Sequence, residues 1–326
     1  MLPEEEMMEQ VKALLINCSK KAVEQARQVI LQENIKNETL HEALRYFMEE
    51  FWYDASHPTL LSLAYEAVGG NPDATIGVGA SFVLLAGAAD IHDDVIDQSL
   101  SKDKMTVFGK FGKDIAIISG NVLWLKGMFM LEEACDSFSE EKKALILNLA
   151  KQAFFDIGSA EAQETSLKGN LNVTPEEYLK IIGLKVSVAT AAAQIGAVIG
   201  NGTEEQVKSL GEYAKNLATL MTIRDEFIDM FELDELTNRF KNECLPLPML
   251  YAFQDINLKK RIVSSLQKGI SEEELKEMLE LVYASSPVKK LVDEMKRSVR
   301  EGLQMVSWVR ENNDFGLLLK STLQGL

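Results

Sequence analysis

Signals that start an α-helix recur along the whole chain, and no segment shows the apolar–polar alternation between tight turns that marks a β-hairpin. The segment Thr174-Pro175-Glu176-Glu177 combines a capping threonine, proline at the first helical position and a glutamate three residues after the cap. Residues 203–206 and 271–274 repeat the capping box, and Ser286-Pro287 starts a further helix. We therefore expect an all-α helical bundle of about a dozen helices, forming a single domain over residues 1–326.

Charge and composition narrow the classes of function. The net charge of −16 argues against binding to a nucleic-acid backbone, which needs clustered Lys and Arg. Cys18, Cys135 and Cys244 are isolated in the sequence, so we expect neither a disulfide framework nor a zinc site, and a reducing cytoplasm fits. The N-terminus is acidic where a signal peptide is basic, and the longest uncharged run, residues 74–89, is shorter than the ~20 residues of a membrane span. The expected protein is cytoplasmic and has no membrane span.

Two of the expected central helices are rich in small residues. These are Gly77, Gly79, Ala80 and residues 86–89 in one helix, and Ala189, residues 191–193 and Gly196 in the other. Small residues permit close packing of helices, and they equally leave room for an elongated apolar cavity inside a bundle. The sequence leaves both interpretations open.

Two acidic segments carry the strongest functional signal, Asp93-Asp94-Val95-Ile96-Asp97 and Asp225-Glu226-Phe227-Ile228-Asp229. In each segment the first and last aspartates are four residues apart, so on a helix both side chains project from one face. Like charges at this spacing destabilise a helix, and each segment follows an apolar stretch in which an unpaired carboxylate is costly. A hard cation removes both costs, and Mg²⁺ takes carboxylates together with substrate phosphates. The pattern predicts a magnesium–diphosphate site whose metal ligands are Asp93, Asp94, Asp97, Asp225 and Asp229.

Over roughly residues 58–251, these segments belong to an ordered set of motifs that resembles the trans-isoprenyl (polyprenyl) diphosphate synthases, whose fold is shared with class I terpene synthases. The first acidic segment, with His92 before it, is similar to the first aspartate-rich motif of that family. The second is similar to the second motif, with Glu226 in place of a usual Asp. The resemblance implies a bundle around an elongated apolar cavity.

Three further positions fit motifs of this family. Gln163 fits its Gly-Gln motif with alanine in the Gly position, and Lys185 fits its Lys-Thr motif with valine in the Thr position. Lys241, ahead of the Leu-Pro-Leu-Pro run at residues 245–248, fits the lysine that follows the second motif. The resemblance implies Mg²⁺ as cofactor and an allylic prenyl diphosphate as substrate, bound by Lys185, Lys241, Lys102 and Gln163. It implies catalytic roles for Asp93, Asp94, Asp97, Asp225 and Lys185, in a homodimer or a heteromer with another prenyl synthase.

The acceptor side departs from the family. Chain-elongating members hold isopentenyl diphosphate with a Gly-Lys-Arg-x-Arg-Pro motif, a His seven residues before the first aspartate, and a pair of Arg after the first motif. Here these positions read Tyr53-Asp54-Ala55-Ser56-His57-Pro58, Ala86 and Lys102-Asp103. A second diphosphate beside Asp54 and Asp103 would be repelled, where the family supplies charge-assisted hydrogen bonds worth ~1.5–3 kcal/mol each. We expect an acceptor other than conventionally bound isopentenyl diphosphate.

Ala88 and Ala89 stand five and four residues before Asp93, where bulky side chains in the family close the product tunnel. Two alanines predict a long pocket for a chain of twenty carbons or more, and ordinary tight packing of helices is the alternative. Asp90 adds a third carboxylate at a usually apolar position, and the sequence does not explain it.

Three functions are compatible with these residues. The first, which we favour, is transfer of a long allylic prenyl cation to an aromatic compound, a hydroxyl compound or another prenyl diphosphate. The second is a terpene synthase, in which the cation cyclises or loses a proton. The third is a subunit of a heteromeric prenyl diphosphate synthase, although such subunits usually lose the first motif, which this chain keeps. The second segment is closer to the synthase form than to the terpene synthase form, which favours transfer.

Overall fold

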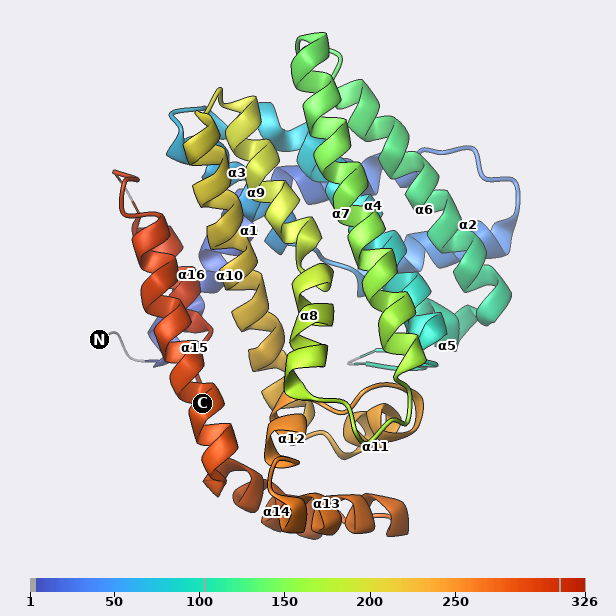
Figure 1. Ribbon diagram of the computed structural model, residues 1–326. Helices are drawn as coiled ribbons and strands as arrows, with labels where there is room; N and C mark the ends of the chain where they lie inside the picture. The colour runs from blue at the N-terminus through green and yellow to red at the C-terminus, as the bar shows by residue number, and fades with distance from the viewer. Residues whose placement is uncertain (1–3, 103, 311, 326) are drawn as a thin grey trace.

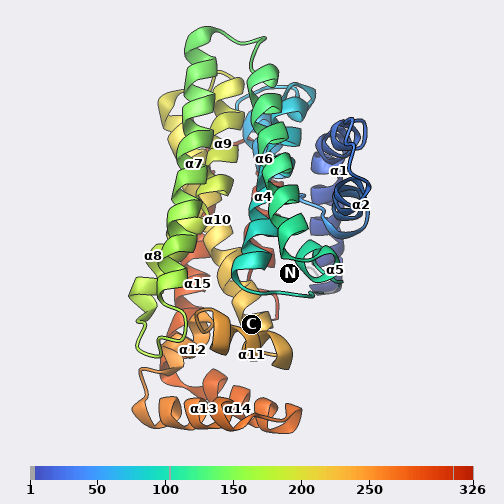
Figure 2. The same ribbon diagram turned by 90° about the vertical axis from the view of Figure 1, so that its right-hand side faces the viewer.

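The computed structural model describes residues 4–102, 104–310 and 312–325, and over these residues the chain forms sixteen α-helices, one π-helical turn, one 3₁₀ turn and no strand (Figure 1). The all-α prediction is confirmed. The count exceeds a dozen because several helices of five to ten residues connect the long ones, and such short segments leave no clear periodicity in a sequence. The long helices stand beside one another, and the last helical hairpin before the C-terminal pair lies across one end of them (Figures 1 and 2).

The elements follow in this order along the chain. They are α1 (Glu4–Leu31), α2 (Glu38–Tyr46), η1 (Phe47–Phe51), α3 (Ser56–Ala67), η2 (Pro72–Thr75), α4 (Ile76–Ile96), α5 (Val107–Phe111), α6 (Lys113–Ala134), α7 (Glu140–Ser166), α8 (Pro175–Lys185), α9 (Ser187–Ile199), α10 (Glu204–Asp229), α11 (Leu233–Asn242), α12 (Leu247–Ala252), α13 (Ile256–Lys268), α14 (Glu272–Ala284), α15 (Ser286–Met305) and α16 (Asn313–Ser321).

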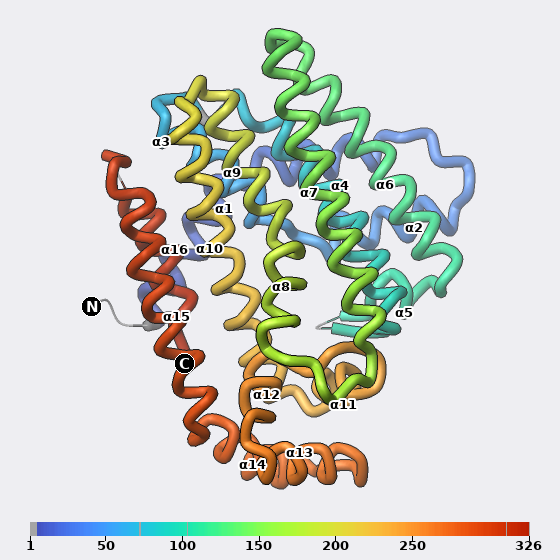
Figure 3. The backbone as a smooth tube through the Cα atoms, in the orientation of Figure 1, coloured from blue at the N-terminus to red at the C-terminus, as the bar shows by residue number. Residues whose placement is uncertain are grey.

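Local capping chemistry sets several helix starts where the sequence predicts them. Reciprocal capping boxes begin α8 at Thr174, α10 at Thr203 and α14 at Ser271, and α15 begins at Ser286. One helix boundary is not visible in the apolar periodicity. The pattern continues from α8 into α9, but the structure has two helices there. The backbone leaves the helical conformation at Val186 and the chain bends there, so that Lys185 is the last residue of α8 (Figure 3).

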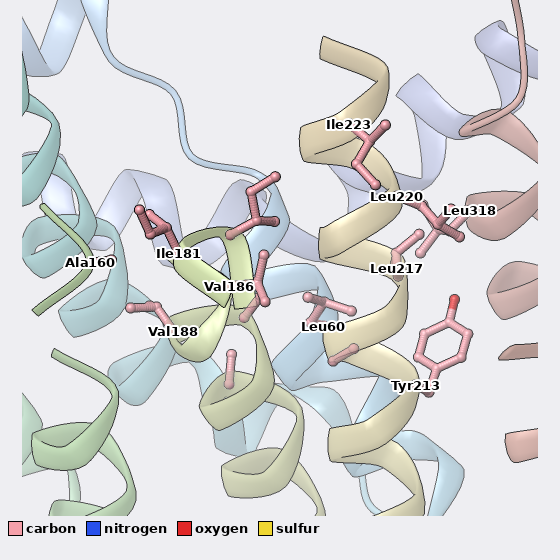
Figure 4. Packing of buried hydrophobic residues seen from close by; sticks show 14 of the residues in the cluster. Leu60, Ala160, Ile181, Val186, Val188, Tyr213, Leu217, Leu220, Ile223 and Leu318 are labelled. Atoms are coloured by element: carbon pink, nitrogen blue, oxygen red, sulfur yellow. The ribbon is translucent and has the colours of Figure 1, made fainter. Parts of the chain in front are cut away.

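Two long helices carry the acidic segments to one end of the bundle. α4 packs mainly on α6, α1 and α3, while α10 packs on α9 and α15. Along α10, Tyr213, Leu217, Leu220 and Ile223 are buried at spacings of three and four, which orients this helix in the core (Figure 4). Beyond this row, the C-terminal ends of α4 and α10 lie near α11 (Figure 2).

A small residue sets the distance between α3 and α9. A Cβ atom added at Gly196 would overlap the backbone carbonyl of Leu61 and lie 3.1 Å from the Cβ of Ala64. Because one neighbour is backbone, it does not move aside as a flexible side chain would. At Gly196, the small residue of α9 therefore allows tight packing of helices.

We predict that Gly196→Ala lowers the free energy of unfolding by about 1–3 kcal/mol, because the added methyl group forces α3 and α9 apart. Gly183→Ala is the matched control, since Gly183 lies within α8 and nothing lies within 4 Å of an added Cβ there. The control is expected to gain about 0.5–1 kcal/mol from helix propensity. Chemical denaturation measures both, and equal effects of the two substitutions would contradict close packing at Gly196.

Three helical segments are long and apolar enough to cross a membrane by length and composition, namely Asp73–Ile96, Lys113–Ala134 and Pro175–Ile199. In two of these segments, 67% of the most apolar stretch of 18 residues is buried inside the bundle, and in the segment that forms α6 this share is 39%. The expected absence of a membrane span therefore stays a prediction.

Candidate active site

The ends of α4 and α10 bring parts of both acidic segments to one pocket. This acidic pocket has a volume of about 670 Å³. It is lined by the carboxylates Asp93, Asp94, Asp97, Asp229, Glu232, Asp234, Glu235 and Glu243, and by Gln98, Ser99, Leu100, Ser101, Lys102 and Asn238. Asp225 lies outside this lining, with an exposed side chain 3.7 Å from the Arg224 guanidinium. The 3.6-residue helical period therefore predicts the position of Asp93 and Asp97 well, and that of Asp225 less well.

Crowding leaves negative charge in this pocket poorly compensated. Asp94 is 1% exposed, and burial together with Asp90 and Asp93 raises its pKa to about 7 although Lys102 acts in the opposite direction. Burial and Asp93 likewise raise the pKa of Asp97 to about 6. The buried Asp93 Oδ1 and Asp94 Oδ2 accept no hydrogen bond within the described residues.

These oxygens fit a hard divalent cation, which binds carboxylates and removes the cost of their mutual repulsion. The donors around the pocket are oxygens, as Mg²⁺ requires, and no cysteine or histidine lines it among the residues that the structure describes. No three acidic, histidine or cysteine side chains in the described ranges already stand close enough to hold a metal ion. Binding would therefore draw Asp93, Asp97 and their neighbours together.

Lys102 explains the third carboxylate of α4. Its Nζ lies 3.0 Å from Asp90 Oδ1 and 3.0 Å from Asp94 Oδ1, and the two carboxylates raise the pKa of Lys102 above its ordinary value despite burial. Asp90 therefore holds Lys102 at the border of the acidic pocket. Lys102 is twelve residues away in the sequence, and the intervening loop concealed this pairing from sequence analysis.

Lys185 is also paired before any substrate binds. Its Nζ contacts Glu164 and lies 3.2 Å from Glu161 Oε1. Burial and the nearby Asp93 raise the pKa of Glu161 to about 8. Sequence analysis missed both glutamates, although their spacing of three residues on α7 would have placed them on one face. It also missed Lys168, whose Nζ lies 3.1 Å from Asp97 Oδ1.

Glu226 does not face the acidic pocket but belongs to a buried polar network. It accepts hydrogen bonds from Tyr178 Oη at 2.7 Å, Arg239 Nη2 at 3.0 Å and the Leu247 backbone N–H at 2.8 Å. Arg239 also donates to Asp229 Oδ2 at 2.8 Å. The extra methylene of glutamate, relative to the aspartate usual in the family, lets this carboxylate reach three donors from other segments.

Arg239 is therefore the buried cation beside the second acidic segment. It is 5% exposed, whereas Lys241 is exposed and lines neither the acidic pocket nor the apolar cavity described next. Positions two residues apart on a helix point about 200° apart, so α11 cannot direct both side chains inward. Gln163, also predicted to bind diphosphate, is exposed and outside both pockets.

An apolar cavity of about 850 Å³ adjoins the acidic pocket. Ala86, Ala89 and Asp93 line it from one face of α4, and Asp93 lines both spaces. Trp124 and Phe154 line it from α6 and α7, with their ring centroids 4.9 Å apart. The remaining lining residues are Trp52, His57, Asp90, His92, Ile96, Ile157, Gly158, Glu161, Ala162, Thr165, Lys185 and Val188.

The two alanines predicted to open a long pocket point in different directions. Ala89 lines the cavity, whereas Ala88 is fully buried in a second core cluster that includes residues of α1 and α2. A one-residue step turns a helix position by about 100°, and the location of neighbouring helices decides which alanine faces the cavity. The small-residue pattern of α4 thus serves both cavity and packing.

On the acceptor side, the segment that departs from the family is partly exposed, and Asp54 is its buried charged residue. Asp54 is 6% exposed and its Oδ1 accepts hydrogen bonds from the backbone N–H groups of Ser56 at 2.9 Å and His57 at 3.2 Å. Its Oδ2 lies 2.7 Å from His57 Nδ1. Asp103, the other acidic replacement, lies outside the described residues.

Solved structures share this fold over nearly the whole chain. Geranylgeranyl pyrophosphate synthetase from Pyrococcus horikoshii matches with a TM-score of 0.85 and 22% identity, covering 98% of this chain and 99% of that one. Polyprenyl synthetase from Streptomyces coelicolor matches with a TM-score of 0.83 and 20% identity, covering 96% and 99%. At these identities the likeness defines the fold, an all-α isoprenyl synthase bundle.

The sequence itself defines the family. A profile of the polyprenyl synthetase family matches residues 55–282, and this chain belongs to that family. Short chain isoprenyl diphosphate synthase from Methanothermobacter thermautotrophicus is 29% identical over 181 residues, 55% of this chain and 54% of that protein. Geranylgeranyl diphosphate synthase from Methanosarcina mazei is 26% identical over 64% of each chain. The matched part thus spans about half to two thirds of these relatives.

Arg239 offers a test of the buried network. We predict that Arg239→Met lowers the free energy of unfolding by about 3–5 kcal/mol, because the buried Glu226 and the half-buried Asp229 lose their cation. Arg261→Met is the matched control, since Arg261 is exposed on α13, and its effect is expected within about 0.5 kcal/mol. Denaturant titration of both variants measures the difference, and comparable losses would refute the role of Arg239.

Proposed function

We propose that the chain is a magnesium-dependent prenyltransferase that ionises a long allylic prenyl diphosphate and transfers the prenyl cation to an acceptor not held as a second diphosphate. The observation that carries this proposal is the position of Asp93, which lines both the acidic pocket and the apolar cavity. A diphosphate in the acidic pocket has space for its hydrocarbon chain directly beside it. The names of the relatives, all isoprenyl diphosphate synthases, support the same class of reaction.

The donor half of the reaction needs negative charge to be stabilised as the allylic C–O bond breaks. Bound by Asp93, Asp94, Asp97 and Asp229, Mg²⁺ would supply that stabilisation by neutralising the leaving diphosphate. Lys185 and Lys102 flank the junction of the two spaces and add positive charge when they exchange a carboxylate partner for the diphosphate. Glu161 and Asp90 are the partners that would be released.

The carbon half needs a dry surface, because water would quench the cation. Trp124, Phe154, Ile157 and Val188 give the cavity that surface, and Ala86 and Ala89 leave it wide on the side of α4. Phe82, one further turn along the same face, is fully buried with its ring centroid 6.1 Å from that of Phe154. The face of α4 that lines the cavity, from Asp93 to Ala86, rises roughly 10 Å at 1.5 Å per residue, and the cavity volume of about 850 Å³ supports a long prenyl chain.

The residues on the acceptor side differ from those of chain-elongating members of the family. A surface pocket of about 460 Å³ adjoins the apolar cavity at Trp52 and Asp90, and its two cations are Lys102 and Lys104. Lys104 donates to the Glu50 carbonyl at 2.6 Å, and Lys102 is paired with Asp90. Asp54 occupies the place of a cation and pairs with His57. A second diphosphate would therefore have to displace existing partners and approach two carboxylates, which supports a different acceptor.

The test is incubation of the purified chain with Mg²⁺ and allylic diphosphates of ten to twenty-five carbons, with and without isopentenyl diphosphate. We expect pyrophosphate release from the twenty-carbon substrate, loss of release on chelation of the metal, and no efficient elongation. Asp93→Asn is expected to lower release by about 100-fold or more. Asp114→Asn, an exposed aspartate in the first turn of α6, is the matched control and should leave release unchanged.

Each other outcome identifies a different function. Efficient elongation with isopentenyl diphosphate would show that the acceptor site is intact in another form. A hydrocarbon or alcohol as the sole product would support a terpene synthase. Turnover that requires an added partner synthase would support a subunit of a heteromeric enzyme. Unchanged release by Asp93→Asn would refute the assignment of the first acidic segment.

We also propose that α6 contacts a second copy of the chain. Its outward face carries Leu125 at 59% and Phe129 at 56% exposure, together with Ile118 and Met128. Exposed apolar groups gathered on one helix face mark an interaction surface. A homodimer through α6 would bury these side chains. The cytoplasmic location of the protein also stays a prediction.

A double substitution on that face tests the association. Leu125→Asp with Phe129→Asp is expected to halve the molar mass measured by light scattering during gel filtration, because each copy would then bury charge at the contact. Ile256→Asp, at an equally exposed apolar residue of α13, is the control and should leave the mass unchanged. The wild type could instead be monomeric and float with lipid vesicles, while the double variant does not. That result would show that this face of α6 contacts a membrane and would contradict the dimer.

A further inference from the structure

Asp54 and His57 form a hydrogen-bonded pair that orients the histidine ring, and binding of an anion would not need this arrangement. One carboxylate oxygen of Asp54 accepts hydrogen bonds from the first two backbone N–H groups of α3, and the other holds the ring of His57 at 2.7 Å. A carboxylate only accepts hydrogen bonds, so His57 Nδ1 carries the proton of this bond. The neutral ring then has its lone pair on Nε2, the nitrogen opposite.

His57 lines the apolar cavity, and its Nε2 makes no hydrogen bond to any residue that the structure describes. Beside it, Trp52 is held by stacking on Phe47, with ring centroids 5.5 Å apart, and by its Nε1–H donated to the Val83 carbonyl at 3.2 Å. Ala86 lines the cavity on the same side with a small side chain. The structure therefore offers an oriented, unpartnered base beside space for a small molecule.

We propose that His57, oriented by Asp54, is the general base that removes the proton of a neutral hydroxyl acceptor during prenyl transfer. This inference rests on the proposed function and specifies its acceptor class. His57 would touch the acceptor and is a catalytic residue in that sense. Asp54 acts through His57 and is a positioning residue.

The step balances without a further reactant. The allylic C–O bond breaks and its electron pair leaves with the diphosphate. A lone pair of the acceptor oxygen forms the new C–O bond, and the proton of that hydroxyl passes to His57 Nε2. The products are a prenyl ether, pyrophosphate and an imidazolium whose charge Asp54 stabilises until the proton is lost to solvent.

The charges around the cavity favour a neutral acceptor. The titratable side chains that share the cavity with His57 are Asp90, His92, Asp93, Glu161 and Lys185, and those in the adjoining surface pocket are Glu50, Tyr53, Lys102 and Lys104. The three lysines already have oxygen partners. Burial lowers the pKa of His57, but the charge and hydrogen bond of Asp54 outweigh burial and raise this pKa above its ordinary value. His57 is thus a stronger base than free imidazole.

The test uses geranylgeranyl diphosphate and Mg²⁺ with glycerol or 4-methylphenol as neutral hydroxyl probes and isopentenyl diphosphate as the anionic probe. Prenyl ether and pyrophosphate are measured separately. We expect His57→Ala to lower ether formation by about 100-fold while pyrophosphate release persists, and added imidazole to restore the ether. His41→Ala, on α2 and outside the cavity lining, is the matched control and should change neither readout.

Asp54→Asn keeps an oxygen for the backbone N–H groups at the start of α3, but it removes the charge and turns an NH₂ donor toward His57 Nδ1, which favours the ring tautomer with its proton on Nε2. A base acts when unprotonated, so ether formation rises with pH through the pKa of His57. Loss of the Asp54 charge lowers that pKa, and the midpoint of the rise should move to lower pH with a smaller maximum rate. Asp255→Asn, which removes the charge from the cap of α13, should leave the profile unchanged.

The two proposals fail in different ways. Ether formation that does not depend on His57, or that falls as pH rises through the pKa of His57, would overturn the base role while pyrophosphate release still supports the prenyltransferase. Preference for isopentenyl diphosphate over both neutral probes would overturn the acceptor class. No pyrophosphate release by the wild type would overturn the proposed function and this inference together.

Discussion

The arrangement of the candidate active site depends on the negative charge that gathers where the ends of α4 and α10 meet α11. Eight carboxylates line the acidic pocket, and their mutual repulsion together with the burial of Asp94 makes unpaired charge costly there. Lys102, Lys168 and Arg239 each lie beside one or more of them, and Lys185 is paired with glutamates at the edge. The compensation is incomplete, and Asp93 Oδ1 and Asp94 Oδ2, which belong to the proposed metal ligands, are among the oxygens of α4 left without donors in the described residues.

The bend at Val186 and the network of Glu226 position these charges. Because α8 ends at Lys185, its ammonium group turns toward Glu161 and Glu164 on α7 and is not carried onward along a continuous helix. Tyr178, about two turns earlier in α8, donates to Glu226 and thereby joins this helix to α10 and α11. Packing and electrostatics therefore fix the lysine and the second acidic segment together.

Local rules predicted much of this structure. Capping boxes placed the starts of α8, α10 and α14, and the helical period placed Asp93 and Asp97 on one face. The sequence did not predict contacts that depend on how distant helices meet. Arg239 and Lys241 are two residues apart with similar charge, and only the position of α11 decides which is buried. The same holds for Ala88 and Ala89, and for the pairing of Asp90 with Lys102 across a loop.

The pairing of Asp90 with Lys102 has a kinetic consequence. It neutralises a cation that stands between the acidic pocket and the acceptor side, so an anionic acceptor meets no free positive charge from Lys102. With a neutral acceptor, as proposed, the two substrates occupy different sites and do not compete for one another's place. Under that proposal, pyrophosphate is expected to inhibit competitively against the prenyl donor alone.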